Sequence, residues 1–255
     1  MNKICLLSIT ASHYRSRVYS EMHKQLGCDF VFGIDNTTVK RLDSSKLGNV
    51  LNVPNKYIGN SLIYYQPNVI KKMRDYKILI NDLGIFSITA WVLLVIAKFR
   101  GQKIYNWDHG WYGREGFVKK FLKRIYFGLA DGALIYGDYA VRLMKDNGFN
   151  PNKLYAVHNS LDHEQQLDLR KSIMPKPIYK EHFGNDNPVL IMIGRLNMRK
   201  NLHQLLEAVA ILRESNKLYN VVLIGDGEDR SKLEEMAVKL GIQIMCFVHL
   251  KVHLI

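Results

Sequence analysis

The sequence predicts an α/β protein with two domains, each built around a parallel sheet, and three observations indicate this. Apolar runs of strand length alternate with helical patterns up to about residue 146, which is the βαβ order of a parallel sheet with right-handed crossovers. A stretch with prolines and polar residues, Ser172–Pro188, then interrupts the alternation, which resumes after it. We therefore expect a first domain at 1–172, a linker at 173–187 and a second domain at 188–255.

The first domain is expected to begin with a strand and to repeat the strand–helix pair. Short apolar runs predict its strands at Lys3–Ile9, Cys28–Phe32, Lys77–Ile80, Lys103–Trp107 and Gly132–Ile135. Helical patterns lie between them at about 14–26, 85–99, 115–129 and 138–146. The apolar run at the N-terminus is far too short for a signal peptide, so we interpret it as the first strand.

The most apolar segment of the chain is Ile85–Ala97, which has 13 residues. A helix that crosses a bilayer needs ~20 apolar residues. The length therefore favours a helix buried in the domain over one inserted in a membrane.

The second domain is expected to have strands at 189–193 and 220–224, helices at 201–215 and 230–240, and a last apolar run at 242–248. Its helices have apolar stripes with helical spacing, formed by Leu202, Leu205, Leu206, Val209 and Leu212, and by Leu233, Met236, Ala237 and Leu240. Asn201 with Gln204, and Ser231 with Glu234, are predicted to cap these two helices. Both domains thus have the pattern of a Rossmann-like fold, the second one incomplete.

The charge of the chain favours an anionic partner. Its 255 residues are 47% hydrophobic, enough for a substantial core, and 36 Lys and Arg against 23 Asp and Glu give a net charge of +13. Phosphate ligands, an anionic membrane face and nucleic acid all fit this charge. The basic residues are scattered and no zinc-finger, RNA-binding or basic-zipper pattern accompanies them, so nucleic acid is the weaker alternative.

The cysteines suggest neither a disulfide framework nor a zinc site. Cys5, Cys28 and Cys246 lie in apolar surroundings without CxxC spacing. A reducing cytosol fits this pattern, and no metal site is expected.

The loop Gly194–Lys200 is the strongest candidate for a binding site. In an open parallel sheet, ligands bind at the carboxyl ends of strands, where loops lead into helix N-termini that favour anions. Gly194 allows close backbone approach, Arg195 offers a planar fork of donors for phosphate oxygens, and Lys200 adds a second cation before the helix. The three residues together predict a diphosphate site, although two basic residues in a polar loop are more often simply solvated.

A second loop of the same domain supports this prediction. Gly225, Asp226 and Gly227 follow the strand at 220–224 and precede the next helix, so we expect them to face a phosphate or a ribose beside the first loop. An ordinary turn is the alternative for a Gly-Asp-Gly sequence taken alone.

These motifs resemble those of the retaining GT-B glycosyltransferases of family 4, the glycosyl transferases group 1. That family has a G-R-x4-K loop, a following apolar helix with LLEA and a later G-D-G, matched here by GRLNMRKN, by LLEA at 205–208 and by 225–227. Upstream, NWDHGWYGREG at 106–116 is similar to the family's His-containing loop, and VHNSLD at 157–162 to its approach to the linker. The resemblance extends up to about Gly241.

The resemblance implies a role for each loop. Arg195 and Lys200 would bind the diphosphate of a nucleotide sugar, and His109 would contact the donor sugar or the reacting centre, with a structural His at the end of its strand as the alternative. Neighbours of His109 are the candidates for the acceptor side, namely Asp108, Trp111, Tyr112, Arg114 and Glu115. The resemblance also implies hexosyl transfer with retention at the anomeric carbon, and no metal, because fixed cations stabilise the leaving diphosphate.

The sequence departs from the family pattern at both ends. The first loop, TASHYRSR at 10–17, lacks the glycines that the family has there. After Gly194 there is no pair of glutamates with the family's E-x7-E spacing, and the final residues diverge after the start of the expected third strand. We therefore expect a truncated second domain, with weak diphosphate binding and negligible turnover for this chain by itself.

The leading hypothesis is a cytoplasmic glycosyltransferase of polysaccharide biosynthesis. It would move a sugar from a nucleotide diphosphate donor to a glycan or lipid-linked acceptor, and the basic charge and the apolar helix suggest a peripheral position on the inner face of the membrane. A non-catalytic nucleotide-binding module is the first alternative, and a basic nucleic-acid-binding protein is the second.

Overall fold

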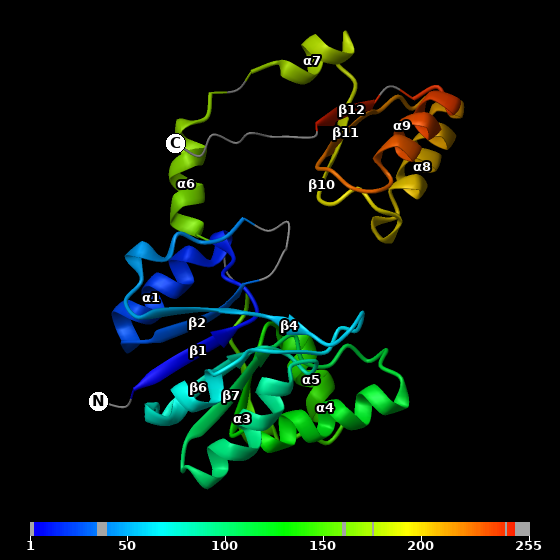
Figure 1. Cartoon of the computed structure of the whole chain (residues 1–255). Coiled ribbons are helices and arrows are strands. Elements are labelled where there is room, and N and C mark those ends of the chain that lie inside the picture. The colour runs from blue at the N-terminus through cyan, green and yellow to red at the C-terminus, as the bar shows by residue number, and fades with distance from the viewer. Residues whose placement is uncertain (1–2, 35–39, 160–161, 175, 243, 248–255) are drawn as a thin grey trace. The chain divides into compact units, whose positions relative to one another are not determined.

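The computed structural model of the chain describes residues 3–34, 40–159, 162–174, 176–242 and 244–247. The chain folds into two compact units, Met1–Ser172 and Ile173–Ile255. Each unit packs helices against a parallel sheet, as Figure 1 shows, so the predicted α/β fold class is confirmed.

The first unit has a sheet of seven parallel strands in the order β3-β2-β1-β6-β7-β8-β9. The strands are β1 Ile4–Ser8, β2 Asp29–Ile34, β3 Val50–Pro54, β6 Ile78–Asp82, β7 Lys103–Asp108, β8 Gly132–Ile135 and β9 Leu154–Ala156. The chain proceeds outward from β1 to β3 and then returns to β6 on the other side of β1. The strand order therefore reverses between β1 and β6, which is where open α/β sheets bind their ligands.

The helices of the first unit cover both faces of this sheet. They are α1 Ser16–Leu26, α2 Val69–Lys72, α3 Ile88–Phe99, α4 Phe117–Leu129, α5 Asp138–Asp146 and α6 His163–Ser172, with 3-10 turns at His13–Arg15, Ser44–Lys46, Met73–Asp75 and Pro151–Lys153. One core cluster joins the sheet to α3, α4 and α5, and a second one joins it to α1. A small antiparallel hairpin, β4 Lys56–Tyr57 and β5 Tyr64–Tyr65, lies outside the main sheet.

The apolar segment Ile85–Ala97 contributes to the core, as expected. It contains most of α3, whose N-terminus is capped by the Ser87 hydroxyl accepting from the Ala90 amide at 3.3 Å, and Leu93 and Leu94 are fully buried. None of the helices that the structure describes combines the length and apolarity that crossing a membrane requires.

The second unit has a three-stranded parallel sheet in the order β10-β11-β12. Its strands are β10 Val189–Ile193, β11 Asn220–Ile224 and β12 Ile244–Phe247, and its helices are α7 Ile178–Phe183, α8 Leu202–Glu214 and α9 Arg230–Lys239, with a 3-10 turn at Met198–Lys200. The predicted stripes supply the core through Leu202, Leu206, Val209, Leu233 and Ala237, all 3% exposed or less.

Both predicted helix caps of this unit are wrong. Asn201 does precede α8, but it has a left-handed backbone with φ of 53° and its side chain makes no capping hydrogen bond. A capping side chain normally acts from an extended backbone, which the tight turn into α8 excludes. Ser231 lies inside α9, which begins at Arg230, and Glu234 accepts from Arg230 Nε at 2.8 Å.

The segment expected as a linker is partly folded. It contains α7, whose Phe183 is buried against Val222 of β11. Apolar contact thus fixes this part of the connection to the second unit. The last residues, 248–255, with the end of the apolar run at 242–248, lie outside the described residues, as does residue 243.

Candidate functional site

A polar pocket of about 260 Å³ lies at the carboxyl ends of the strands where the order of the first sheet reverses. Ser8 ends β1 and Asp82 ends β6, and the two residues lie side by side in the parallel pairing of these strands. The pocket is also lined by Arg15 from the turn before α1, by Asp108 and His109 at the end of β7, and by Tyr136 after β8. Among these residues, the sequence predicted only Asp108 and His109.

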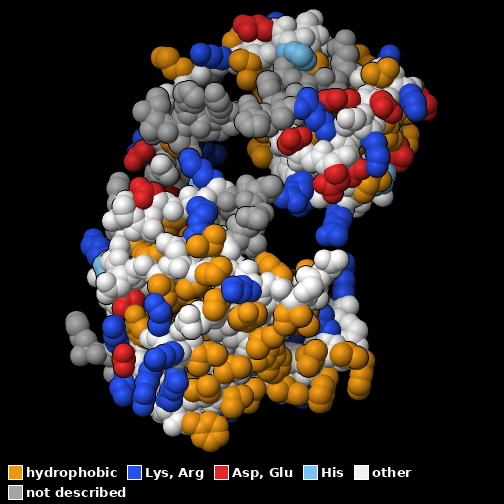
Figure 2. Space-filling model, in the orientation of Figure 1, with side chains coloured by type: hydrophobic (Ala, Val, Ile, Leu, Met, Phe, Trp, Pro, Cys, Tyr) orange, Lys and Arg blue, Asp and Glu red, His pale blue; other side chains and the backbone are white. Residues whose placement is uncertain are grey.

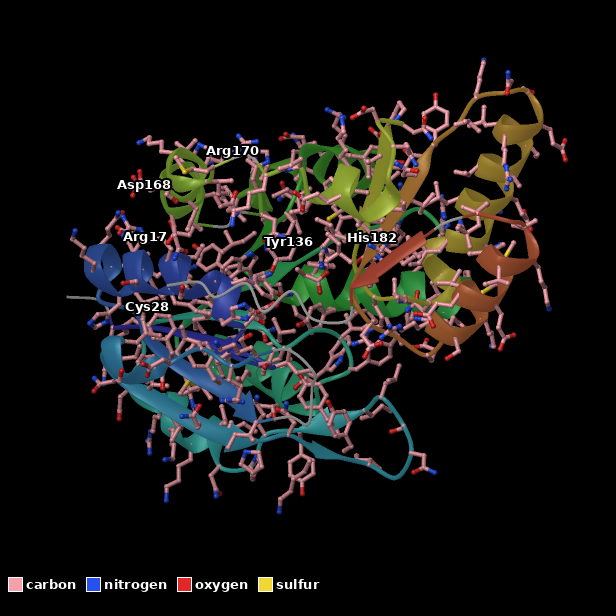
Figure 3. The ribbon with its side chains drawn as sticks, turned by 90° about the horizontal axis from the view of Figure 1, so that it is seen from above. Arg17, Cys28, Tyr136, Asp168, Arg170 and His182 are labelled. Carbon is pink, nitrogen blue, oxygen red and sulfur yellow. The ribbon has the colours of Figure 1, made fainter. Side chains whose placement is uncertain are left out.

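Arg15 connects the two sides of this pocket. Its Nη1 atom lies 3.6 Å from Asp82 Oδ2, and its Nη2 atom donates to the Tyr136 hydroxyl at 2.6 Å. The guanidinium also lies over two aromatic rings, 5.3 Å from the centroid of Trp107 and 5.1 Å from that of Tyr136. Tyr136 lies at the centre of the view in Figure 3. The loop at 10–17, which lacks the glycines that the resemblance led us to expect, therefore contributes an arginine to this pocket.

Asp82 is held so that it can exist in either protonation state near neutral pH. The pKa of Asp82 is raised to about 7, chiefly by burial and also by the nearby Asp108, against the lowering effects of Arg15 and Ser8. The Ser8 hydroxyl lies 2.8 Å from Asp82 Oδ2 and 3.0 Å from the Thr10 carbonyl oxygen. Ser8 can thus donate to an ionised Asp82, or donate to Thr10 while it accepts from a protonated Asp82.

His109 lies at the open edge of the same pocket. Its side chain is exposed, and its ring centroid is 4.6 Å from that of Tyr136 and 6.1 Å from that of Tyr112. Asp108 accepts from the Gly110 amide at 2.8 Å, and burial raises the pKa of its carboxyl group. An exposed imidazole that lines the same pocket as two carboxyl groups of raised pKa can contact a ligand bound there.

The predicted acceptor-side residues divide among three places. Asp108 lines the pocket just described, whereas Tyr112, Arg114 and Glu115 line a separate hollow of about 560 Å³ with Gly116, Lys119 and Tyr139. Trp111 is 4% exposed and its ring packs edge-on against Phe149 in the core. The Trp111 side chain thus anchors the loop 110–116 to the core.

Glu115 belongs to a buried ion pair. Glu115 Oε1 lies 2.9 Å from Lys123 Nζ, with both side chains 4% exposed or less, and it also accepts from the Tyr112 amide at 2.9 Å. Burial acts to raise the pKa of Glu115, but the hydrogen bonds from Lys123 and from the backbone outweigh it and lower the pKa to about 2. This pair fixes the loop 110–116 to α4, since Lys123 also donates to the Gly110 carbonyl group.

The predicted diphosphate loop of the second unit lies at the carboxyl end of β10. Gly194 directly follows the strand and its amide donates to the Ile224 carbonyl oxygen at 2.9 Å, while Leu196 of the loop is fully buried. Arg195 and Lys200 are both exposed on this loop, which leads into the N-terminus of α8. The buried Leu196 thus fixes a short loop that presents two cations beside a helix N-terminus.

The Gly-Asp-Gly loop packs directly against this loop. A Cβ atom on Gly225, which has φ of 145°, would clash with the Gly194 carbonyl oxygen, and one on Gly227 would clash with the Leu196 carbonyl oxygen. The Leu196 amide donates to the Asp226 carbonyl oxygen at 3.0 Å across the same contact. Both glycines are therefore needed for close packing of the two backbones, and the exposed Asp226 side chain accepts from the Gly227 amide at 3.0 Å.

Asp229 is the residue that the sequence prediction missed in this unit. Its carboxylate is buried, and it accepts from the Met198 amide at 2.8 Å and from Lys232 Nζ at 2.9 Å, which lower its pKa. The carboxylate thereby ties the start of α9 to the turn that carries Lys200. Its position two residues after Gly227 is the only sequence signal for this role.

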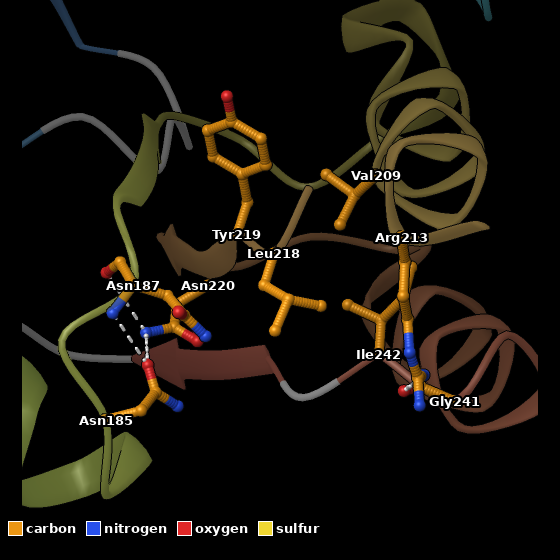
Figure 4. A pocket seen from close by; sticks show the side chains of 9 residues that line it. All are labelled: Asn185, Asn187, Val209, Arg213, Leu218, Tyr219, Asn220, Gly241 and Ile242. Carbon is orange, nitrogen blue, oxygen red and sulfur yellow. Dashed lines mark hydrogen bonds between the residues drawn. The ribbon is translucent and has the colours of Figure 1, made fainter. Parts of the chain in front are cut away.

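A further hollow of about 210 Å³ in the second unit lies at the opposite end of its sheet (Figure 4). There Asn220 at the start of β11 donates to Asn185 at 2.8 Å, and Arg213 donates to the Gly241 carbonyl group. Since these contacts join the segment before β10 to β11, and α8 to the end of α9, we assign them to the stability of the unit.

The structure also bears on the cysteines and on metal binding. Cys5 and Cys28 are buried free thiols in the first unit, and the Cys246 side chain lies outside the described residues. No group of three or more His, Cys, Asp or Glu side chains that could hold a metal ion occurs within the described ranges. The expectation of a metal-free reaction stays a prediction.

Residues 176–254 match the family described as glycosyl transferases group 1. A protein of Bacillus subtilis (strain 168) named "Putative glycosyltransferase EpsD" is 22% identical over 198 residues, which cover 74% of this chain and 51% of that protein. The chain therefore spans about half the length of this curated relative.

Solved structures share the fold over nearly the whole chain. The lipopolysaccharide outer core galactosyltransferase WaaB in its apo form has a TM-score of 0.61 at 15% identity, covering 98% of this chain and 68% of its own. Anabaena Alr3699/HepE in complex with UDP has a TM-score of 0.67 at 13% identity, with 98% and 70% covered. The UDP-GlcNAc 2-epimerase from Neisseria meningitidis bound to UDP-GlcNAc has a TM-score of 0.54 at 10% identity, with 98% and 72% covered.

The family match and these folds confirm the resemblance to GT-B glycosyltransferases. At such low identities the structural likeness by itself shows only the fold, and that fold is shared with an epimerase. Retention at the anomeric carbon and membership of family 4 stay predictions.

Proposed function

We propose that this chain, whose residues 176–254 match the glycosyl transferases group 1, serves in the transfer of a sugar from a nucleotide diphosphate donor. The observation that carries the proposal is the loop Gly194–Lys200, which presents Arg195 and Lys200 at the carboxyl end of β10 and at the start of α8. The complexes of Alr3699/HepE with UDP and with UDP-glucose support a uridine nucleotide as the first donor class to test.

The proposed chemistry uses these cations on the leaving group. Breaking the bond between the sugar and the diphosphate increases the negative charge on the diphosphate, and fixed cations stabilise that charge more in the transition state than in the ground state. The contact of Gly225 and Gly227 with the loop, and the bond from Met198 to Asp229, hold it in place before the donor binds. Within this proposal the reaction needs no metal and retains the anomeric configuration.

The pocket at the end of β1 and β6 supplies the groups that we assign to the acceptor side. His109 is the residue we assign to the reacting centre, and Asp82, Asp108 and Arg15 provide hydrogen-bonding partners for sugar hydroxyls. Asp82, with a pKa of about 7, can accept a proton from such a hydroxyl group at neutral pH and pass one to solvent.

We further propose that the acceptor is a glycan or a lipid-linked glycan of polysaccharide biosynthesis and that the protein acts in the cytoplasm beside a membrane. The net charge of +13 supports an anionic membrane face, where polybasic proteins accumulate. Which sugar is transferred depends on side chains in loops that vary between proteins of one fold.

The experiment that tests the function is a panel of nucleoside diphosphates and nucleotide sugars, read first by thermal shift and then by release of nucleoside diphosphate with and without acceptor. Stabilisation by a diphosphate nucleotide and acceptor-dependent release support transfer. Binding without release from any donor would instead identify a non-catalytic nucleotide-binding module. Conversion of the sugar without an acceptor would identify an epimerase, and steeply salt-dependent binding of oligonucleotides alone would identify a nucleic-acid-binding protein.

A further inference from the structure

Helix α4 has apolar side chains on two opposite faces. Its inward face buries Tyr126 and Phe127 in the core of the first unit. Its outward face exposes a second set of large apolar side chains, namely Phe117 at 85%, Val118 at 69%, Phe121 at 59%, Leu122 at 42% and Ile125 at 39%. These five residues have the spacing of one helical face, so α4 presents an apolar stripe that the described part of the unit leaves uncovered.

The neighbouring helix α3 extends this apolar surface. The two helices pack together, with the Trp91 and Tyr126 rings edge-on at 5.3 Å. On its outward side α3 exposes Phe99 at 87%, Val95 at 45% and Ile88 at 39%. Figure 2 shows hydrophobic side chains gathered over the lower part of the view, where Figure 1 places α3 and α4. We name these eight side chains of the two helices the α3/α4 surface.

Cations accompany the α3/α4 surface, and acidic residues are absent from both helices. The segments ITAWVLLVIAKF and FVKKFLKRIYFGL contain no Asp or Glu. Lys98, Lys119, Lys120 and Arg124 of these helices have exposed side chains, and the Arg124 guanidinium lies 6.0 Å from the centroid of the Phe149 ring. Lys123, in contrast, points inward to Glu115. The outward side of the two helices is therefore apolar and basic.

Apolar and basic side chains together distinguish between the two partners that could cover the α3/α4 surface, a second copy of the chain and a lipid bilayer. A symmetric dimer would bring Lys98, Lys120 and Arg124 of two copies to one interface without acidic partners from these helices, and like charges at an interface are strongly unfavourable. An anionic bilayer accepts both features, because apolar side chains enter the boundary of headgroups and acyl chains while lysines and arginines remain at the phosphates.

We propose that the α3/α4 surface binds an anionic lipid bilayer, with α4 lying in the plane of the interface. Aromatic and aliphatic residues on one face of a helix of 13 residues suit this position, whereas the helix is too short to cross. This proposal rests on the proposed membrane location of the protein and assigns that contact to the α3/α4 surface. It does not depend on the nucleotide loop of the second unit.

The test is sedimentation of the full chain with phosphatidylcholine vesicles that contain or lack phosphatidylglycerol. We expect binding to the anionic vesicles, decreasing as salt is added because the basic side chains are screened. Phe117→Ser combined with Phe121→Ser is expected to weaken the partition by about tenfold or more, since two large apolar contacts are lost. Lys98→Glu combined with Lys120→Glu is expected to weaken it by a similar factor, on anionic vesicles only.

A matched control comes from exposed apolar side chains on the helices of the second unit. Ile211→Ser combined with Val238→Ser removes side chains that are 63% and 79% exposed on α8 and α9, and should leave the partition unchanged. Circular dichroism and nucleotide binding of every variant report whether both units stay folded. Arg195→Ala should weaken nucleotide binding without affecting vesicle binding, so a failure of one proposal can be distinguished from a failure of the other.

Three outcomes would overturn the inference. One is the absence of binding to anionic vesicles, and another is equal binding by the wild type and the Phe117→Ser, Phe121→Ser variant. The third is a dimer of the wild type, measured by light scattering, that the same double substitution converts to a monomer. That result would assign the α3/α4 surface to a second copy of the chain.

Discussion

The Ser8 hydroxyl group lies 2.8 Å from the carboxylate of Asp82, across the two strands between which the order of the first sheet reverses. Arg15 Nη1 lies 3.6 Å from the same carboxylate oxygen. Two residues from two other segments thus contact one ionisable group at the place where such sheets bind ligands.

The stability of the protein should depend on pH through Asp82. The pKa of Asp82 is about 7 in the folded chain and has its ordinary value of 3.8 when unfolded, so the folded state holds the extra proton between these values. The free energy of unfolding should therefore fall as pH rises from about 4 to about 7, by at most about 1.4 kcal/mol per pH unit from this group.

Asp82→Asn should remove this part of the pH dependence, as measured by urea unfolding at a series of pH values with tryptophan fluorescence. All three tryptophans, Trp91, Trp107 and Trp111, lie in the first unit, so the signal reports on it. The Asp82→Asn variant should keep a smaller decrease of the free energy of unfolding with pH, because the pKa of Asp108 is also raised. An identical slope in the wild type and the variant would refute the assignment.

Arg195→Ala and Lys200→Ala should each weaken the binding of nucleoside diphosphates. Charge-assisted hydrogen bonds contribute roughly 1.5–3 kcal/mol each, so affinity should fall by about ten- to a hundredfold, measured by calorimetry. Both side chains are exposed and lie outside the core, so the fold should be unchanged.

Arg199→Ala is the matched control, since Arg199 is exposed on the same turn and is adjacent to Lys200. Its affinity should stay within a few-fold of the wild type, because one general surface charge contributes little when it is screened. Equal losses of affinity in all three variants would indicate a general attraction by positive charge and not specific binding by Arg195 and Lys200.

Gly225→Ala should destabilise the second unit by about 2 kcal/mol or more, because the new Cβ atom meets a backbone carbonyl group that cannot move aside. Circular dichroism should show early loss of helix, while tryptophan fluorescence, which reports on the first unit, should be unchanged. The contrasting variant is Gly128→Ala in α4, where no atom lies within 4 Å of the new Cβ atom.

Gly128→Ala should stabilise the first unit by about 0.5–1 kcal/mol, since alanine restricts the unfolded chain and favours the helix. A Gly225→Ala protein as stable as the wild type would mean that the two loops can separate without cost.

Lys123→Met should destabilise the first unit by about 3–5 kcal/mol, because it leaves the carboxylate of Glu115 buried without its partner. Adding Glu115→Leu should recover most of this loss, since the pair is then replaced by apolar side chains. Urea unfolding of the two single variants and the double variant measures the coupling. Additive losses would show that the pair makes no net contribution.

Local patterns were sufficient to predict the central strands of both sheets and most of the long helices. The strands at the centre of each sheet are continuous apolar runs, and the long helices have clear stripes or a fully apolar composition, so both could be identified from spacing. The short edge strands β3 and β9, the hairpin and helices α2, α6 and α7 were missed. The edge strands and α7 depend on contacts with distant segments, and α6 has no buried residue that would give it an apolar stripe.

The sequence by itself determined the α/β class, the two successive sheets and the loop with Arg195 and Lys200, because periodicity and motif spacing are properties of neighbouring residues. Only the tertiary structure joined Ser8, Arg15, Asp82 and Tyr136, since a parallel sheet aligns the ends of strands that lie far apart in the chain. It also decided that Gly225 and Gly227 pack against backbone, that Glu115 belongs to a buried pair, and that α4 exposes an apolar face in the described part of the chain. Burial and close approach depend on which segments the fold brings together, and spacing along the chain does not encode them.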